Sequence, residues 1–401
     1  MRQRIDIWVF GGMVIMAVII AMATVSVYLQ PEKQRDFAIA YAAATALDQG
    51  LQPYDTTVIA PMMRAPVAPY VYPPYTLYLF RPLTWFDFDT AARIYLTLKF
   101  ITLGGLLYLW HRLIDLNQYR GLLWVVIPLA YSGALLADLR AGNISVFEQL
   151  FIWLGFYLYT RGRLVGFGLA IVVAALFKLT PILLLGLLAT RWKKKELAIG
   201  AICGAVFIVL IGISAAVWPE LFSAFLKNVH QLGGERGESN PSSWALVSDM
   251  AGWLQMKIHG NVPAIFPFCV YAVMAAAVLA VSIAMFCRLR FLEQKRGDLW
   301  RICLLCFLYA LVLPRFKDYS YLLLIAPSLY VLFSGKWLNP LLPFCGLLII
   351  YSYRNFQYLG TALEPFYQTQ GAYYRLILAY ALFVLCCCCV WRETEGQKVN
   401  N

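Results

Sequence analysis

The stretch MRQRIDIWVFGGMVIMAVIIAMATVSVYL, residues 1–29, decides the class of fold. Basic side chains precede an apolar run of about 23 residues, which is long enough to cross the hydrocarbon core of a bilayer. No small-residue cleavage site follows the run, so we expect a retained membrane span rather than a removed signal peptide. Because an excess of Lys and Arg stays on the cytoplasmic side, we predict a cytoplasmic N-terminus.

The rest of the chain is equally apolar. Of the 401 residues, 61% are apolar and 13% are charged, which lies outside the range of soluble globular proteins. Apolar stretches recur along residues 1–401 without a polar low-complexity linker. We therefore expect one integral membrane domain, an all-α polytopic bundle with about 12 spans. An even number of crossings returns the C-terminus to the cytoplasm.

Hydropathy and chain breakers divide the sequence into these spans. They are expected near Ile7–Leu29, Ala91–His111, Gly121–Asp138, Asn143–Thr160, Leu164–Phe177, Pro181–Thr190, Glu196–Trp218, Val262–Phe286, Leu299–Leu313, Tyr319–Phe333, Trp337–Ser352 and Ala372–Trp391. The stretch 164–190 could form one tilted helix, but Lys178 and Pro181 interrupt it. We favour two short helices that meet at Lys178.

The predicted topology accounts for the net charge of +12. In this arrangement the loops on the side of the N-terminus hold a large excess of Lys and Arg, whereas the opposite side is balanced in charge. The basic character is therefore topological and gives no reason to expect nucleic acid as a partner.

Two segments on the opposite, outer side are too long to be simple turns, and a third, shorter segment lies on the same side. They comprise about residues 30–90, 219–261 and 353–371. Long connections are often functional, and most acidic side chains that could perform chemistry lie in or beside them. We therefore expect the active face of the domain to be the non-cytoplasmic face.

A small-residue helix is predicted directly after the first span, in RDFAIAYAAATALDQGLQPYD, residues 35–55. Alanine is the best helix former, Asp36 could serve as the N-cap, and Gly50 is a stop signal. Phe37 and Tyr41 share one face, where they could rest on lipid or on the bundle. The following YVYPPYTLYLFRPLTWFDF, residues 70–88, is short for a crossing and suits an interfacial or re-entrant segment.

Several motifs carry a resemblance to a known family by their order and spacing. They are residues 35–55, VYPPYTLYLFRPL (71–83), LRAGN (139–143), LFKLTP (176–181), ESNPSSW (238–244) and LVLPRFKDYSYLLLIAP (311–327). Over most of its length the chain resembles the polyprenyl-phosphate-mannose-dependent alpha-(1,2)-mannosyltransferases of the glycosyltransferase-C superfamily. The resemblance implies a hexosyltransferase that moves mannose or a similar hexose from a polyprenyl-phosphate donor to a lipid or glycan acceptor.

The resemblance also implies a location and a catalytic base. Transfer would occur on the outer face of a bacterial inner membrane, facing the periplasm or exterior, in cell-envelope glycan synthesis. An acidic residue just after the first span is the general base in that superfamily, and Asp36 matches it. A positioned carboxylate that removes the acceptor proton contributes about 10²–10⁴-fold to the rate. Helix capping is the alternative role of Asp36, while Asp48 and Asp55 are expected to be solvated helix-end and turn residues.

Cations are expected to bind the phosphate of the donor. Lys178 is the first candidate, because an ionisable side chain between two apolar helices is often functional; snorkelling to the interface is its alternative. Arg315 and Lys317 could also bind the phosphate or anchor the helix end at the interface. The resembling family has Pro-x-x-Trp, an acid and His here, whereas this chain has Lys317 for the Trp, Asp318 for the acid and no His.

Polar and aromatic side chains near the outer ends of the spans are candidates for substrate binding. The candidates are Tyr41, Tyr72, Asn143, Asn240, Ser243, Trp244 and Asp318. Asn143 could bind sugar hydroxyls or cap the next helix. Trp244 could stack on a sugar or lie in the interfacial aromatic belt.

No metal or other cofactor is expected, because a lipid-linked sugar phosphate is an activated donor and the histidines show no zinc-binding spacing. The expected partners are the donor, the acceptor and membrane lipids. A donor carrying a pentose or aminoarabinose is the alternative within the enzyme class. A lipid or solute transporter is the alternative outside it, although the two related halves typical of transporters are not evident. A purely structural role would leave the polar outer motifs unexplained.

Overall fold

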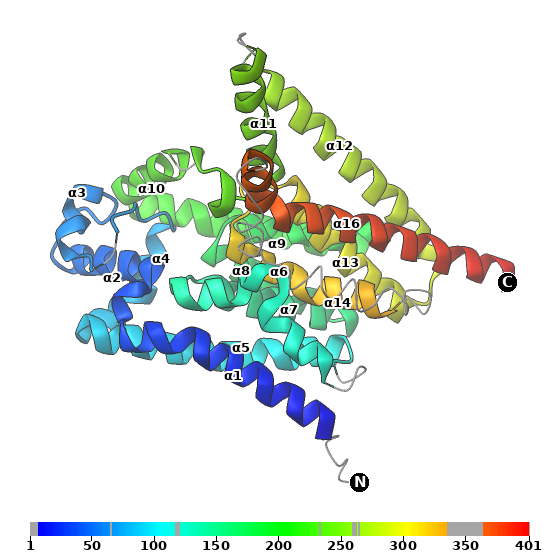
Figure 1. Cartoon of the computed structure of the whole chain (residues 1–401), viewed down its shortest axis with the longest axis horizontal. Helices are drawn as coiled ribbons and strands as arrows, with labels where there is room; N and C mark the ends of the chain where they lie inside the picture. Colours follow the sequence, from blue (N-terminus) through cyan, green and yellow to red (C-terminus); the bar gives the residue numbers. More distant parts are fainter. Residues whose placement is uncertain are drawn as a thin grey trace. The chain divides into compact units, whose positions relative to one another are not determined.

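The computed structural model describes residues 7–64, 66–116, 121–231, 234–258, 263, 265–334 and 364–400. Within these residues the structure is helical and contains no β-strand, as predicted for an all-α protein (Figure 1). The chain forms two compact units. The first unit comprises residues 1–121 and 135–234, and the second unit comprises residues 122–134 and 235–401.

The first unit combines long helices with short helices and 3₁₀ turns. Its elements are α1 (Ile7–Leu29), η1 (Pro31–Lys33), α2 (Arg35–Asp48), α3 (Thr56–Ile59), η2 (Ala60–Met62), α4 (Pro74–Phe80), η3 (Arg81–Trp85), α5 (Phe88–Leu113), the end of α6 (Leu122–Ala141), α7 (Ser145–Thr160), α8 (Leu164–Phe177), η4 (Thr180–Arg191), α9 (Lys194–Val217) and α10 (Pro219–Gln231). The predicted break at Lys178 is confirmed, because this residue is extended between α8 and η4.

The second unit contains the beginning of α6 and the C-terminal part of the chain. Its further elements are η6 (Gly237–Ser239), α11 (Ser243–Ile258), α12 (Ile265–Arg288), η7 (Leu289–Phe291), α13 (Gln294–Val312), η8 (Asp318–Leu324), α14 (Ile325–Ser334) and α16 (Glu364–Asn400). The second outer segment, for which the sequence analysis predicted no helix, thus holds α10 and α11.

Six helices of the described residues are long and apolar enough to cross a membrane. They lie at Ile7–Leu29, Phe88–Leu113, Leu122–Ala141, Lys194–Val217, Ile265–Phe291 and Ala372–Gln397, and shorter apolar helices occur at Leu164–Phe177, Thr180–Arg191 and Asp318–Ser334. The chain is therefore an integral membrane protein, while a total of about 12 crossings stays a prediction. The predicted span Trp337–Ser352 and residues 353–363 of the third outer segment lie outside the described residues.

Helix α6 contains a break that the sequence analysis did not predict. Tyr131, Ser132 and Gly133 have φ angles of 52°, 54° and 74°, and such left-handed backbone is costly for residues other than glycine. Contacts inside the second unit hold it. The Tyr131 hydroxyl lies 2.7 Å from Ser328 Oγ, and Arg375 Nε donates to the Tyr131 carbonyl across 2.8 Å. The boundary between the units directly follows this break.

Helix α2 packs into the core of the first unit. Its alanines are buried, and Phe37 is fully buried with its ring stacked on Tyr95 of α5 at 4.7 Å between centroids. Figure 1 shows α2 beside α4, against which it packs. Small side chains allow this close approach between helices, so the predicted aromatic face of α2 rests on protein rather than on lipid.

The start of α2 differs from the prediction. The helix begins at Arg35 with Gln34 in the N-cap position, and Asp36 lies within the first turn. The expected capping role of Asp36 is therefore wrong. A carboxylate in the first turn is nevertheless favourable, because the N-terminal end of a helix carries partial positive charge. The helix ends at Asp48, and Gly50 follows with a φ of 68°, as its predicted stop function requires.

Candidate active site

Asp36 is held by a side chain from the turn between α6 and α7. Asn143 Nδ2 donates a hydrogen bond to Asp36 Oδ2 at 2.5 Å and another to the Tyr72 hydroxyl at 3.1 Å. Both acceptors, Asp36 and Tyr72, come from the first outer segment. The structure therefore brings together three of the predicted site residues, which stand up to 107 positions apart in the sequence.

The orientation of the Asn143 amide follows from its other partners. Its Oδ1 accepts hydrogen bonds from the backbone N–H of Ser145 at 3.0 Å and from Ser145 Oγ at 2.8 Å. These bonds form a local turn from Asn143 to Ser145, the first residue of α7. Because Oδ1 faces α7, the NH₂ group is directed at Asp36 and Tyr72. The N-cap of α7 is Ile144, so the predicted capping role of Asn143 is wrong, but its side chain still bonds the first residue of α7 while it contacts the candidate base.

Lys178 joins this cluster from the junction of α8 and η4. Its ammonium group donates to Asn143 Oδ1 at 3.2 Å and to Ser145 Oγ, and it forms an ion pair with Glu148 Oε2 at 3.1 Å. The side chain of Lys178 is 21% exposed and that of Glu148 is 7% exposed. An anionic ligand could therefore reach Lys178, but it would share this cation with Glu148. We name these residues, Asp36, Tyr72, Asn143, Ser145, Glu148 and Lys178, the Asp36 cluster.

Tyr72 is a neutral hydrogen-bonding group in this cluster. Burial, followed by the negative charge of Asp36, raises the pKa of Tyr72 well above its ordinary value. The phenol therefore keeps its proton at any physiological pH. Its position beside the carboxylate makes it available to a ligand hydroxyl as either donor or acceptor.

A second cluster lies in the second unit and contains both remaining cation candidates. Arg315 Nη2 and Nε lie 2.8 Å and 3.1 Å from Glu235 Oε2, and Lys317 Nζ lies 3.1 Å from Glu235 Oε1. Burial raises the pKa of Glu235, but the charges of Arg315 and Lys317 outweigh it and lower the pKa below its ordinary value. All three side chains are partly exposed. We name these three residues the Glu235 cluster.

The neighbouring polar loop is fixed from within the second unit. Asn240 is buried, donates to the carbonyl of Glu235 at 3.0 Å and accepts from the N–H of Phe316 at 2.8 Å. Ser243 Oγ donates to the Leu311 carbonyl at 2.7 Å. These two predicted substrate-binding residues therefore have structural partners, and Asn240 ties the segment of Glu235 to that of Arg315 and Lys317.

The other candidates occupy separate positions. Trp244 is half-buried and makes an edge contact with the ring of Tyr271. Asp318 begins η8, directly after Lys317. The Tyr41 hydroxyl donates to the carbonyl of Phe86 at 2.8 Å, so the structure gives it a packing role in α2. Tyr41 and Asp36 lie on the same helix, but no contact of the described residues brings Tyr41 into the Asp36 cluster.

Four charged residues near the candidates were not predicted as site residues. Glu148 pairs with Lys178, Glu235 pairs with both Arg315 and Lys317, and Lys99 of α5 forms a fully buried ion pair with Asp138 at 2.7 Å. Lys99 had a visible signal, because it is a single charge within an apolar span. No signal in the sequence identified its partner, since the pairing depends on how α5 and the end of α6 pack.

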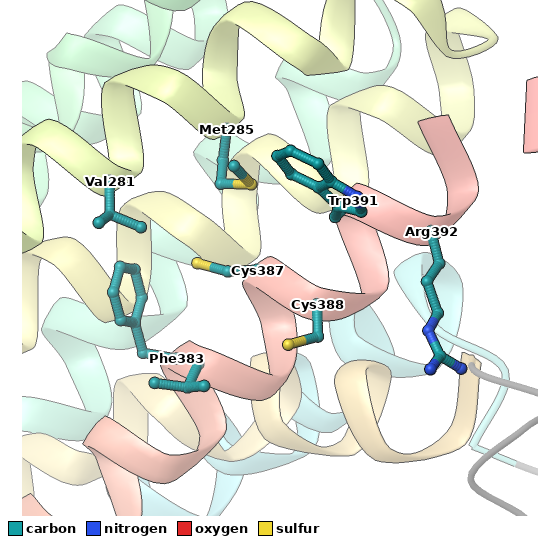
Figure 2. A pocket seen from close by; sticks show the side chains of 8 residues that line it. Val281, Met285, Phe383, Cys387, Cys388, Trp391 and Arg392 are labelled. Carbon is teal, nitrogen blue, oxygen red and sulfur yellow. The ribbon is translucent and has the colours of Figure 1, made fainter. Parts of the chain in front are cut away.

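The described residues offer little support for other kinds of site. No group of three or more His, Cys, Asp or Glu side chains in them could hold a metal ion. A pocket between α12 and α16 in the second unit is lined by Val281, Met285, Phe383, Val384, Cys387, Cys388, Trp391 and Arg392 (Figure 2). Its lining is apolar apart from Arg392, so it offers no acid or base for group transfer.

Comparisons with known proteins agree with a transferase. Residues 70–314 match the model of glycosyltransferase family 87. No curated protein and no solved structure matches the chain. The matched range includes Tyr72, Asn143 and Lys178 of the Asp36 cluster, whereas Asp36 itself precedes the range and Arg315 and Lys317 follow it.

Proposed function

The chain belongs to glycosyltransferase family 87, and from this premise we propose that it transfers a hexose, mannose or a similar sugar, from a polyprenyl-phosphate donor. The acceptor is a hydroxyl group of a lipid or glycan on the non-cytoplasmic face of the inner membrane. The family makes the protein a membrane glycosyltransferase. The donor, the sugar and the face of the membrane are the proposed part.

Asp36 is the proposed general base. Its carboxylate takes the proton of the acceptor hydroxyl while that oxygen forms a bond to the anomeric carbon of the sugar. The bond between the anomeric carbon and the phosphate oxygen breaks, and polyprenyl phosphate leaves with the electron pair. The observation that carries this proposal is the hydrogen bond from Asn143 to Asp36, which fixes a partly exposed carboxylate in one orientation.

The leaving phosphate needs positive charge more than it needs an acid. Lys178 lies in the same cluster as Asp36 and is the proposed first contact. Arg315 and Lys317 are a second proposed contact, because a guanidinium group can bind two phosphate oxygens at once. No step of this scheme requires a metal or another cofactor. Tyr72, Asn240, Ser243, Trp244 and Asp318 stay candidates for contacts with the sugar or acceptor.

The proposal is tested by the variant Asp36→Asn. With a synthetic polyprenyl-phosphate mannose as donor, we expect kcat to fall about 10²–10⁴-fold while donor binding is retained. Asp48→Asn is a matched control on the same helix, since Asp48 lies at its other end and pairs with Arg81 at 2.6 Å. Full activity of Asp36→Asn would overturn the assignment of the base.

A panel of donors tests the class of sugar. Mannose, glucose, a pentose and aminoarabinose on the same polyprenyl phosphate are compared by product formation and by mass spectrometry of the glycolipid product. A clear preference for a pentose or aminoarabinose would replace hexose transfer by the alternative donor. Transfer from none of the lipid-linked sugars would contradict the donor class.

A further inference from the structure

Lys99 is a fully buried charge near the proposed base. It lies within α5, and its side chain and that of Asp138 are both 0% exposed. An ammonium group in such a place is strongly unfavourable unless each of its donors has a partner. Lys99 Nζ lies 2.7 Å from Asp138 Oδ2, 2.6 Å from the Asp138 carbonyl and 2.6 Å from the Asn143 carbonyl. Lys99 therefore donates two hydrogen bonds to backbone carbonyls and forms an ion pair with the Asp138 carboxylate, whose two oxygens have no hydrogen-bond partner among the described residues.

The two carbonyl groups belong to one turn. Gly142 follows α6 with a φ of 66°, and the N–H of Asn143 donates to the Asp138 carbonyl at 3.2 Å. This is the hydrogen bond that closes a Schellman motif at the end of a helix. Lys99 binds the carbonyl that accepts this bond and the carbonyl of the residue that donates it. One ammonium group thus fixes both ends of the turn.

The same turn determines where the side chain of Asn143 lies. Gly142 packs against the start of α2, since a Cβ atom there would lie 2.8 Å from Phe37 Cβ. The next residue, Asn143, then directs its amide at Asp36. Helix α5 also supports α2 directly, because Tyr95, one turn before Lys99, stacks on Phe37. A continuous series of contacts therefore leads from Lys99 through the backbone of Asn143 to the carboxylate of Asp36.

We infer that Lys99, together with Asp138, is a positioning residue for catalysis, which holds the turn at Gly142 so that Asn143 orients Asp36. This inference rests on the proposed role of Asp36 as the base. It assigns to the buried pair a function in the transfer step that goes beyond stabilising the helix bundle. It also explains why a costly charge lies in α5, at the depth of the carbonyl groups that end α6.

The experiment uses paired substitutions, because a single change would leave one buried charge without a partner and threaten folding. Lys99→Met/Asp138→Leu is an apolar pair of similar size, and Lys99→Gln/Asp138→Asn is a neutral pair that keeps hydrogen-bond donors. Arg301→Met/Asp298→Leu is the control, since it removes another buried ion pair, at 3.0 Å within α13 of the second unit. Asp36→Asn serves as the reference for loss of the base.

For the apolar pair we expect kcat to fall about 10–100-fold, because misplacing a catalytic group by about 1 Å has an effect of this size. The KM for the polyprenyl-phosphate donor should stay within about twofold, and the neutral hydrogen-bonding pair should recover most of kcat. Hydrogen–deuterium exchange of residues 138–147 should rise in the apolar pair only. The control pair should keep the kcat of the unmodified protein.

Each other outcome is decisive. If the apolar pair folds and keeps its kcat while Asp36→Asn is inactive, the inference about Lys99 is overturned. The proposed function of Asp36 is then unaffected. A hydrogen-bonding pair as impaired as the apolar pair would also overturn it, because the bonds to the two carbonyls would then not matter. Full activity of Asp36→Asn would overturn both the assignment of Asp36 as the base and this inference. If the apolar pair does not fold, Lys99→Met/Asp138→Asn replaces it in the same comparison.

Discussion

Asn143 donates to Asp36 across 2.5 Å, and this single hydrogen bond joins the end of α6 to the first turn of α2. The donor belongs to the range that matches the family, whereas the acceptor lies before it. The proposed catalytic role of Asp36 therefore depends on a contact between two segments that are distant in the sequence. Substitutions at this contact and at the charges around it have distinct expected effects.

Replacing Asn143 should separate its two functions. Asn143→Ala removes the donor to Asp36 and the acceptor for Ser145, so we expect kcat to fall about 100-fold with modest destabilisation. Asn143→Asp keeps an acceptor for Ser145 but places a second carboxylate against Asp36. It should retain more thermal stability than the alanine variant and have lower activity. An aspartate variant with full activity would contradict the orientation of the amide.

Gly142 should be intolerant of any side chain for two physical reasons. Alanine there costs about 1–2 kcal/mol for the left-handed backbone, and its Cβ would also lie 2.8 Å from Phe37 Cβ. Gly50 is the matched control, since its φ is 68° and a Cβ atom added there would have nothing within 4 Å. Thermal unfolding should show a larger loss for Gly142→Ala than for Gly50→Ala. Equal losses would show that the turn has room to move.

Removing Lys178 alone should mix a structural effect with a functional one. Lys178→Met leaves Glu148 buried without its cation, and an unsatisfied charged group of this kind costs roughly 1–3 kcal/mol or more. The double variant Lys178→Met/Glu148→Gln removes this penalty. We expect the double variant to fold like the unmodified protein and to bind the lipid-phosphate donor at least about tenfold more weakly. Unchanged donor affinity in the folded double variant would exclude Lys178 as a phosphate contact.

Glu235 should compete with phosphate for Arg315 and Lys317. The variant Glu235→Gln keeps the shape of the side chain and removes its charge, so both cations become more available to an anion. We expect donor affinity to rise several-fold, on the order of 1 kcal/mol, as measured by equilibrium binding. In Arg315→Gln/Lys317→Gln the same substitution of Glu235 should have no effect. If donor affinity still rises on substitution of Glu235 in Arg315→Gln/Lys317→Gln, the donor phosphate binds at another site.

The Glu235 cluster should also give a defined dependence of stability on pH. The pKa of Glu235 is lowered from its ordinary value of 4.5 by Arg315 and Lys317. Its contribution to stability is thus fully present above the unfolded pKa and is lost as the pH falls through the lower folded pKa. The difference in Tm between the unmodified protein and Glu235→Gln should be constant near neutral pH and vanish in acid. A difference that grows in acid would contradict the ion pairs.

Parts of this fold could be predicted because the signals are local. The bounds of α1 and α8 agree with the sequence analysis, since each is a long apolar run with polar residues at its ends. The junction at Lys178 was predictable as well, because a charge and a nearby proline interrupt an apolar stretch. The alanines of α2 predicted that this segment is helical. They did not predict the residue at which the helix begins.

Other parts depend on distant contacts. Pro128 and Gly133 are local signals for an interruption of α6, but the left-handed conformation of Tyr131 and Ser132 is held by partners at Ser328 and Arg375. Asp36 was a candidate from its position after the first span, but its orientation depends on Asn143. The counter-charges Glu148 and Glu235 were invisible for the same reason, because charge pairing across 30 to 82 residues follows from packing alone.

The break in α6 has a consequence for how this sequence can change. A continuous helix transmits an inserted residue as a rotation of about 100° to everything beyond it. At Tyr131–Gly133 the hydrogen-bond register of α6 is interrupted, so an insertion or deletion before the break need not rotate Asp138 away from Lys99. The first half of α6 can therefore drift in length and sequence while the second half keeps its alignment. Because of the break, changes in the first half of α6 need not move the turn that carries Asn143.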